Sequence, residues 1–213
     1  MYYRLMDHIN KDEVIKKENS IQYRYIFGEE KWFPTYMLSE YDYPDSIFYD
    51  MYEEIDENEA FDLIKLKREQ LLKLEKLAYE TAKKAHENQF DKGGKPYFEH
   101  PLFVSQQIKN IEGKIVALLH DICEDTDITL NDLLDLGFTL RIVQAINVLS
   151  RKSDDEYEQY LQKVKSNYIA RIVKISDIKH NMDITRIQNP TIKDHQRILK
   201  YEKALSFLED EES

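Results

Sequence analysis

The feature that most constrains the fold of this chain is an apolar run that ends abruptly in four ionisable residues. Residues 115–119 have the sequence IVALL and are followed closely by His120, Asp121, Glu124 and Asp125. A segment that is apolar on every side predicts a helix buried at the centre of a helical protein. Because residues four apart share one side of a helix, the ionisable side chains should project from one edge of it. Burying them without partners would cost several kcal/mol.

A divalent metal would satisfy these groups, because imidazole and carboxylate are ligands for Zn²⁺, Mn²⁺ and Fe²⁺. Alternatively, the helix ends at the surface and its charged residues meet water. In VKISDIKHN, Asp177, His180 and Asn181 share one helical face after a buried turn. An aspartate there favours a cation, although an ion pair or a helix cap also fits. In KPYFEHP, two prolines fix the chain around His100, which could equally be a structural histidine.

Helical periodicity dominates the chain from about residue 62 onward. Asp56 and Glu59 have the spacing of a capping box that opens the first helix, which runs toward His86 and is ended by DKGGKP. We predict a mainly α fold, a helical bundle with a small β-containing appendage at the N-terminus. Further helices are predicted over residues 98–110, 114–125, 129–136, 140–150, 156–167, 168–182 and 198–208.

The first 60 residues differ in composition from the rest. Residues 1–63 contain nine of the fifteen tyrosines and the only tryptophan, Trp32, and they hold 16 acidic residues against 6 basic ones. YYRLM and the two extended runs of YRYIFGEEKWFP predict strands. We therefore predict two domains, an acidic β-containing appendage over residues 1–60, where a protein partner could bind, and a helical domain over residues 61–213.

Charge and hydropathy exclude several classes of function. The net charge of −11 argues against binding of extended nucleic acid. Residues 64–213 hold 24 basic and 25 acidic residues, so local positive charge can still meet a small anionic substrate. With no apolar run near the roughly 20 residues of a membrane span and no signal-peptide pattern, we expect a cytoplasmic protein without membrane contact. The single cysteine, Cys123, lies among acidic residues, which disfavour a thiolate nucleophile.

Taken together, these segments resemble the HD-domain superfamily of metal-dependent phosphohydrolases, whose signature is H…HD…D. They are most similar to the hydrolase domain of the (p)ppGpp hydrolases of the stringent response and their stand-alone relatives, through AHENQFDKGGKPYFEHPLFV, ALLHDICEDTDIT and VKISDIKHNMD. The resemblance covers about residues 68–187. It implies a helical HD-domain fold and a metal, commonly Mn²⁺ or another divalent transition metal. The matching metal ligands are His100, His120, Asp121 and Asp177.

The same resemblance implies roles for residues around the metal. Glu124 and Asp125 match the acidic pair that positions or deprotonates the attacking water, and Asn181 matches a residue at the phosphate edge of the pocket. His180 could contact phosphate or donate a proton to the leaving group. Phosphoryl oxygens also require nearby cations. The basic residues close to the motifs in the sequence are Lys92, Lys95, Lys174, Lys179 and Arg186.

We predict an enzyme that uses a metal-activated water to hydrolyse the 3′-pyrophosphate of a small nucleotide, (p)ppGpp. The alternatives are a phosphatase of another nucleotide, such as NADPH or a nucleoside monophosphate, and a non-catalytic nucleotide-sensing module. One departure from the family concerns the base. Where the family usually has an arginine that can lie against the purine, this chain has Asp91, which cannot stack as a guanidinium does. We therefore expect weaker selection of the base, with the metal chemistry intact.

Overall fold

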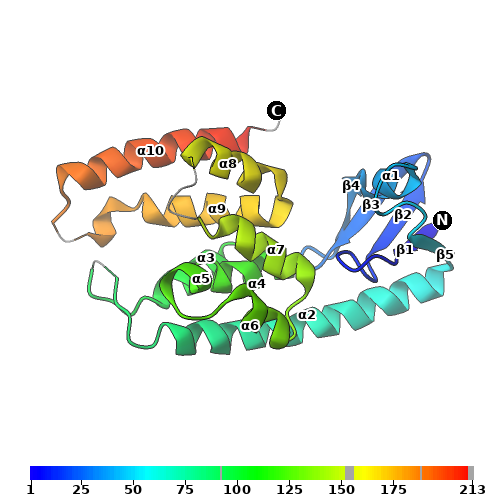
Figure 1. Cartoon of the computed structure of the whole chain (residues 1–213), viewed down its shortest axis with the longest axis horizontal. Helices are drawn as coiled ribbons and strands as arrows, with labels where there is room; N and C mark the ends of the chain where they lie inside the picture. The colour runs from blue at the N-terminus through cyan, green and yellow to red at the C-terminus, as the bar shows by residue number, and fades with distance from the viewer. Residues whose placement is uncertain (92, 152–155, 188, 211–213) are drawn as a thin grey trace. The chain divides into compact units, whose positions relative to one another are not determined.

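A five-stranded antiparallel sheet forms the first part of the chain (Figure 1). The structure is a computed structural model, and it describes residues 1–91, 93–151, 156–187 and 189–210. The strands lie in the order β4-β3-β2-β1-β5. They are β1 (Tyr2–Leu5), β2 (Val14–Glu18), β3 (Ile21–Ile26), β4 (Lys31–Thr35) and β5 (Tyr52–Ile55). The predicted strands correspond to β1, β3 and β4, whereas β2 (VIKKE) and β5 (YEEI) escaped prediction because charged residues interrupt their apolar pattern.

The core of this sheet lies under a short helix, α1 (Met37–Asp42). Leu5 of β1 and Ile15 of β2 pack with Leu38 and Tyr41 of α1, and all four side chains are buried. Burial of these apolar side chains supplies the main driving force that holds the helix on the sheet. The sequence did not predict α1, because its six residues are too few to show a helical period.

The helix α2 (Glu57–Ala85) begins at the predicted capping box. The main-chain amide of Glu59 donates to the Asp56 carboxylate (3.0 Å), and the Asp56 amide donates to the Glu59 carboxylate (3.1 Å). The chain divides into two compact units within this helix, after Lys73. The first unit comprises Met1–Lys73 and Thr139–Arg141, and the second comprises Leu74–Phe138 and Ile142–Ser213.

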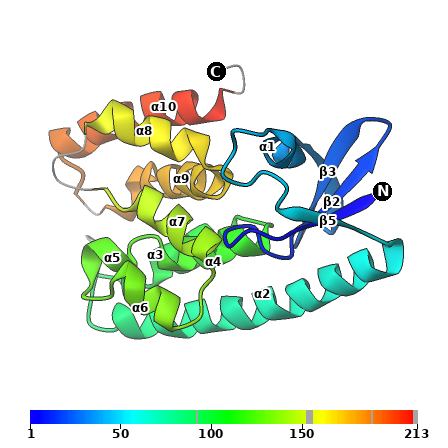
Figure 2. The ribbon, with the colours of Figure 1, turned by 45° about the vertical axis from the view of Figure 1, so that its right-hand side comes forward.

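The second unit is a bundle of helices in which α9 occupies the centre (Figure 2). Its elements are α3 (Glu99–Gln106), α4 (Ile111–Leu119), α5 (Ile122–Asp125), α6 (Leu130–Asp135), α7 (Leu140–Leu149), α8 (Tyr157–Ser166), α9 (Tyr168–Asn181), the 3-10 turn η1 (Ile184–Arg186) and α10 (Ile192–Glu209). Helix α9 contacts α3, α4, α8 and α10. The predicted mainly α fold with a small N-terminal β-containing part is therefore confirmed. Among the described residues, no helix combines the length and apolar character that crossing a bilayer requires.

The apolar run 115–119 is buried in α4, as predicted, but the prediction of one helix through residue 125 is wrong. Helix α4 ends at Leu119 and α5 begins at Ile122. The reason lies in the His120 ring, whose Nδ1 is 2.8 Å from the Ala117 carbonyl oxygen. A continuing helix would need that carbonyl for the amide of Asp121, so the side chain competes with the backbone and interrupts the helix.

Candidate functional site

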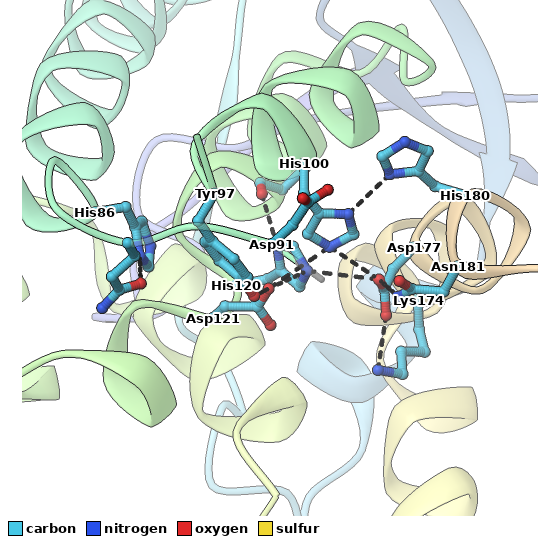
Figure 3. A network of polar contacts seen from close by, with 12 residues as sticks. His86, Asp91, Tyr97, His100, His120, Asp121, Lys174, Asp177, His180 and Asn181 are labelled. Atoms are coloured by element: carbon cyan, nitrogen blue, oxygen red, sulfur yellow. Dashed lines mark hydrogen bonds and ion pairs between the residues drawn. The ribbon is translucent and has the colours of Figure 1, made fainter. Parts of the chain in front are cut away.

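Four ionisable side chains from different helices converge at one point (Figure 3). His100 comes from α3 and Asp177 from α9, while His120 and Asp121 link α4 to α5. The Nε2 atom of His100 is 3.2 Å from Oδ1 of Asp177 and 3.6 Å from Oδ2 of Asp121. The Nε2 atom of His120 is 3.1 Å from the same Asp121 oxygen and 3.8 Å from the same Asp177 oxygen. The structure thus brings together the four residues that the sequence predicts as metal ligands.

The hydrogen bond of the His120 ring determines which ring nitrogen carries the proton. A carbonyl oxygen can only accept, so the Nδ1 atom that faces Ala117 carries the proton. In the neutral ring, the buried Nε2 atom then presents a lone pair toward Asp121 and Asp177. It has no partner in hydrogen-bonding geometry among the described residues. A lone pair that faces carboxylate oxygens is unfavourable unless a positive charge lies between them.

That positive charge can be a proton or a metal ion. Burial disfavours protonation of His120, but the carboxylates of Asp121 and Asp177 outweigh burial and raise its pKa to about 9. A divalent metal would supply the same charge, and ligand atoms of His100, His120 and Asp177 all lie within 4.8 Å of one another. A metal-binding imidazole is usually oriented by an N–H bond to a carbonyl or carboxylate, as the His120 ring is here. The cluster therefore fits a divalent metal.

Asp177 is fixed by two neighbours on its own helix. Lys174 donates to its Oδ2 atom (2.8 Å), and the Asn181 side chain donates to its Oδ1 atom (2.6 Å). Burial opposes the charged forms of Asp177 and Lys174, but their mutual attraction outweighs it. The pKa of Asp177 therefore lies well below its ordinary value, and the pKa of Lys174 lies well above. The main partner of Lys174 is therefore Asp177, although Lys174 also borders the cleft described below.

Asp121 is oriented by Tyr97, a residue to which sequence analysis assigned no function. The Tyr97 hydroxyl donates to Oδ2 of Asp121 (2.6 Å), and its ring lies against the rings of His86 and His100, with centroids 4.9 Å and 5.9 Å away. Burial and the Asp121 charge raise the pKa of Tyr97, so its hydroxyl stays protonated and donates. No local sequence signal marks this contact, because the two residues meet only in the folded chain.

The two predicted catalytic acids lie at the end of α5 beside the cluster. Oε1 of Glu124 accepts a hydrogen bond from the main-chain amide of Arg151 (2.5 Å). Burial, aided by the charges of Asp121 and Asp125, raises the pKa of Glu124 above its ordinary value. The main-chain oxygen of Asp125 accepts from the side-chain amide of Gln89 (2.7 Å). The neighbouring Cys123 thiol has a pKa raised by burial and by nearby carboxylates, in line with the prediction that it is not a nucleophile.

A cleft of about 400 Å³ opens beside this cluster. The predicted site residues that line it are His100, Asp121, Glu124, Asp125, Lys174, Asp177, Asn181 and Arg186. Arg197 and Tyr201 of α10 also line it, and sequence analysis assigned them no site role. They are four residues apart on one helical face, but Tyr201 belongs to an apolar stripe and resembles a core residue. The Nε atom of Arg197 is buried and has no hydrogen-bond partner among the described residues.

Other predicted substrate contacts are not among the residues that line this cleft. Lys95 is exposed, and Lys179 pairs with Glu209 (2.8 Å). Lys92 lies outside the described residues. His180 lies behind His100, with its ring against Phe103 at a centroid distance of 4.1 Å. Helical spacing explains the position of His180. Its side chain, three residues beyond Asp177, points toward α3, whereas the side chain of Asn181, four residues beyond Asp177, lines the cleft.

No protein-family model matches the chain. Among curated relatives, the guanosine-3′,5′-bis(diphosphate) 3′-pyrophosphohydrolase MESH1 of Danio rerio is 31% identical over 139 residues, which cover 60% of this chain and 77% of that protein. The bifunctional (p)ppGpp synthase/hydrolase SpoT of Escherichia coli K12 is 30% identical over 119 residues. That match covers 49% of this chain, and the chain spans only 17% of the length of SpoT.

A solved structure supports the same fold. It is described as a metazoan ortholog of SpoT that hydrolyses ppGpp, and it matches with a TM-score of 0.55 over 64% of this chain and 85% of that one. At 20% sequence identity this match speaks for the fold alone. The relationship to the Danio rerio protein is closer in sequence and covers most of that protein. The chain therefore belongs to the HD-domain (p)ppGpp hydrolase family.

Proposed function

We propose that the protein is a metal-dependent phosphohydrolase that removes the 3′-pyrophosphate of (p)ppGpp. The observation that carries this proposal is the convergence of two histidines and two aspartates beside two further acids in one cleft. Relatives named 3′-pyrophosphohydrolases supply the substrate class. A purely binding site would have no use for a pair of water-positioning acids beside the cluster, so the geometry favours an enzyme over a nucleotide sensor.

We propose that His100, His120, Asp121 and Asp177 hold a divalent metal, with Mn²⁺ as first candidate. Carboxylates suit Mn²⁺ and imidazoles suit the transition metals generally, so the mixed set agrees with this choice. When bound, such an ion would lower the pKa of water toward about 7 and act as a Lewis acid on phosphoryl oxygens. Tyr97, Lys174 and the Ala117 carbonyl keep three of the four ligands in place.

Glu124 and Asp125 are the proposed catalytic acids, because they border the cleft next to the metal cluster. The Arg151 amide occupies Oε1 of Glu124 and leaves Oε2 for the attacking water. Burial, followed by nearby negative charge, raises the pKa of Glu124 and makes it a stronger proton acceptor. Asp125 is proposed to orient the water from the adjacent position.

Phosphate recognition is assigned to cations that line the cleft. Arg186 and Arg197 bring positive charge to it, which attracts phosphate oxygens. The buried Nε atom of Arg197, which lacks a partner among the described residues, is a donor that a phosphate would satisfy. Asn181 is proposed to add a neutral contact at the metal edge, while Lys174 offsets negative charge there.

The test is a panel of substrates with added Mn²⁺: (p)ppGpp, NADPH and nucleoside monophosphates. We expect pyrophosphate to be released from (p)ppGpp, together with GDP or GTP, and Glu124→Gln to abolish most of this release. Preferential turnover of NADPH or of a monophosphate would identify a different nucleotide phosphatase. Tight nucleotide binding without turnover of any substrate, with the metal bound, would mean that the protein is a sensor.

A further inference from the structure

The ring of His180 contacts a proposed metal ligand rather than the cleft. Its Nδ1 atom lies 2.8 Å from Nδ1 of His100, and the two rings are nearly coplanar, with an interplanar angle of 6° (Figure 3). One face of the His180 ring stacks on Phe103, at a centroid distance of 4.1 Å and an interplanar angle of 18°. Two imidazoles can share a hydrogen bond only if one nitrogen donates and the other accepts, so the direction of this bond decides which tautomer each ring adopts.

The contact with Arg186 favours one direction of this hydrogen bond. The Nη1 atom of Arg186 lies 3.4 Å from the same Nδ1 atom of His180 and 3.3 Å from the His180 carbonyl oxygen. A guanidinium donates and cannot accept, so this contact is attractive only where Nδ1 of His180 offers a lone pair, which it then shares between Arg186 and the closer His100. His100 therefore carries its proton on Nδ1 and donates to His180. Its Nε2 atom is left without a proton, facing Asp177 and Asp121, and an unprotonated nitrogen is what a metal requires.

Arg186 is held in turn by Asp91. Its Nη2 atom lies 3.3 Å from Oδ2 of Asp91, while Oδ1 of Asp91 accepts from the main-chain amides of Gly93 (2.8 Å) and Lys95 (2.9 Å). The carboxylate thus ties the loop to the guanidinium. A side chain at position 93 would meet the Arg186 carbonyl oxygen at 2.9 Å, so this close approach requires glycine. Asp91, which replaces the arginine usual in the family, therefore serves as the counter-ion of another arginine.

We propose that Asp91, Arg186 and His180 form a relay that fixes the tautomer and orientation of His100, with His180 as a positioning residue for the metal site. The inference rests on the proposed metal centre, but not on the identity of the substrate. Contacts of this kind behind a metal ligand typically contribute about 10–100-fold to metal affinity. The relay also connects Asp91, which is held by the amides of Gly93 and Lys95, to the proposed metal ligand His100.

The decisive comparison is His180→Leu with His180→Asn, because both remove the ring that packs on Phe103 and only asparagine restores an acceptor near the position of Nδ1. We expect His180→Leu to weaken Mn²⁺ binding, measured by calorimetric titration of metal-free protein, by about 10–100-fold. His180→Asn should retain most of the affinity. At saturating Mn²⁺, His180→Leu should recover kcat, and its KM for the nucleotide should stay near that of the unchanged protein.

Further variants separate the relay from packing and from the proposed function. Phe103→Leu removes the ring contact but keeps the hydrogen bond, so Mn²⁺ affinity should persist. Asp91→Asn should weaken Mn²⁺ binding, and by a smaller factor when His180→Leu is already present. Unchanged Mn²⁺ affinity in His180→Leu together with a raised KM would overturn the relay and make His180 a substrate contact. Absence of Mn²⁺ binding by the unchanged protein would instead overturn the metal centre itself.

Discussion

At the scale of single residues, the proposed metal ligands differ from the proposed catalytic acids in their surroundings. His120 is buried and faces two carboxylates, whereas Glu124 borders the cleft and keeps one oxygen free of the Arg151 amide. Metal ligands and proton acceptors are drawn from the same residue types, so residue type alone does not distinguish them. Their contacts in the folded protein distinguish them, because a metal ligand faces a position that requires positive charge, whereas a proton acceptor borders space for a water molecule.

This difference in surroundings leads to the first prediction. Glu124→Gln and Asp125→Asn should retain bound Mn²⁺ and lose turnover by about 10²–10⁴-fold, the usual contribution of proton-transfer groups. His120→Ala should lose the metal itself, because its Nε2 atom is the buried lone pair of the cluster. Metal content by atomic emission and kcat on (p)ppGpp distinguish the two effects. Normal rates in both acid variants would show that these acids are structural.

The second prediction concerns selection of the base. Position 91 holds an aspartate, which is engaged by Arg186 and by two main-chain amides, so it offers no cation that could stack on a purine. Loss of such a stacked cation costs about 0.5–2 kcal/mol of binding. We expect kcat/KM for guanosine and adenosine 3′-pyrophosphates to differ far less than the roughly 10⁴-fold of sites that hydrogen-bond a distinguishing group. A guanine preference of that size would show that another residue, with Arg186 the first to test, reads the base.

Much of the metal site could be predicted from the sequence, because its residues fall in short segments whose chemistry is visible locally. His120 and Asp121 follow an apolar run, and Asp177 follows a buried helical turn. The relay through His180 could not be predicted, because Asp91 and Arg186 are distant in the chain and the tautomer of an imidazole depends on three-dimensional neighbours. Tyr97 and Arg197 were missed for the same reason, since Tyr97 meets Asp121, and Arg197 lines the cleft, only in the folded chain.

At the scale of elements, the position of His120 depends on where α4 begins and ends. The helix begins at Ile111 and is capped by Asn110, whose buried side chain accepts from the amide of Gly113 (2.7 Å). It ends where the His120 ring takes the Ala117 carbonyl. The start was absent from the sequence prediction, which placed the helix at residue 114, because residues 110–113 (NIEG) lack a clear apolar pattern. Caps therefore define this element more sharply than hydrophobicity does.

The third prediction tests this cap. Asn110→Ala should lower the free energy of unfolding by about 1–2 kcal/mol, because the amide of Gly113 loses its acceptor at the helix start. Asn110→Ser keeps an acceptor oxygen and should lose less. Urea unfolding followed by circular dichroism gives both values. Equal losses in the two variants would indicate that the amide side chain stabilises the fold through packing rather than through the cap.

At the scale of the whole molecule, two units of different character share one chain. The segment 1–63 carries 16 acidic residues against 6 basic ones, and Tyr36, Tyr43 and Ile47 are exposed on it. A protein partner at residues 1–60 remains a prediction, as does the domain boundary placed there by composition. The two compact units of the structure divide within α2, after Lys73, where a continuous helix carries no sequence signal of a division.

The fourth prediction concerns the effect of metal binding on the free energy of unfolding of the whole protein. A ligand that binds only the folded protein at about 100 times its Kd raises the free energy of unfolding by about 2.7 kcal/mol. We therefore expect added Mn²⁺ to raise the melting temperature of metal-free protein and a chelator to reverse the shift. The Asp177→Ala variant should show no such shift, because it lacks a ligand of the cluster. A shift of equal size in that variant would place the bound metal elsewhere.

The main-chain contact between Arg151 and Glu124 has a consequence for how this family varies. Every amino acid except proline supplies the same amide, so substitutions at position 151 can accumulate while the carboxylate stays fixed. A comparison of related sequences would therefore find this position variable and pass over it, although the proposed catalytic acid Glu124 depends on the path of the chain there. Such relatives would share the path of the backbone at position 151 and the absence of proline there.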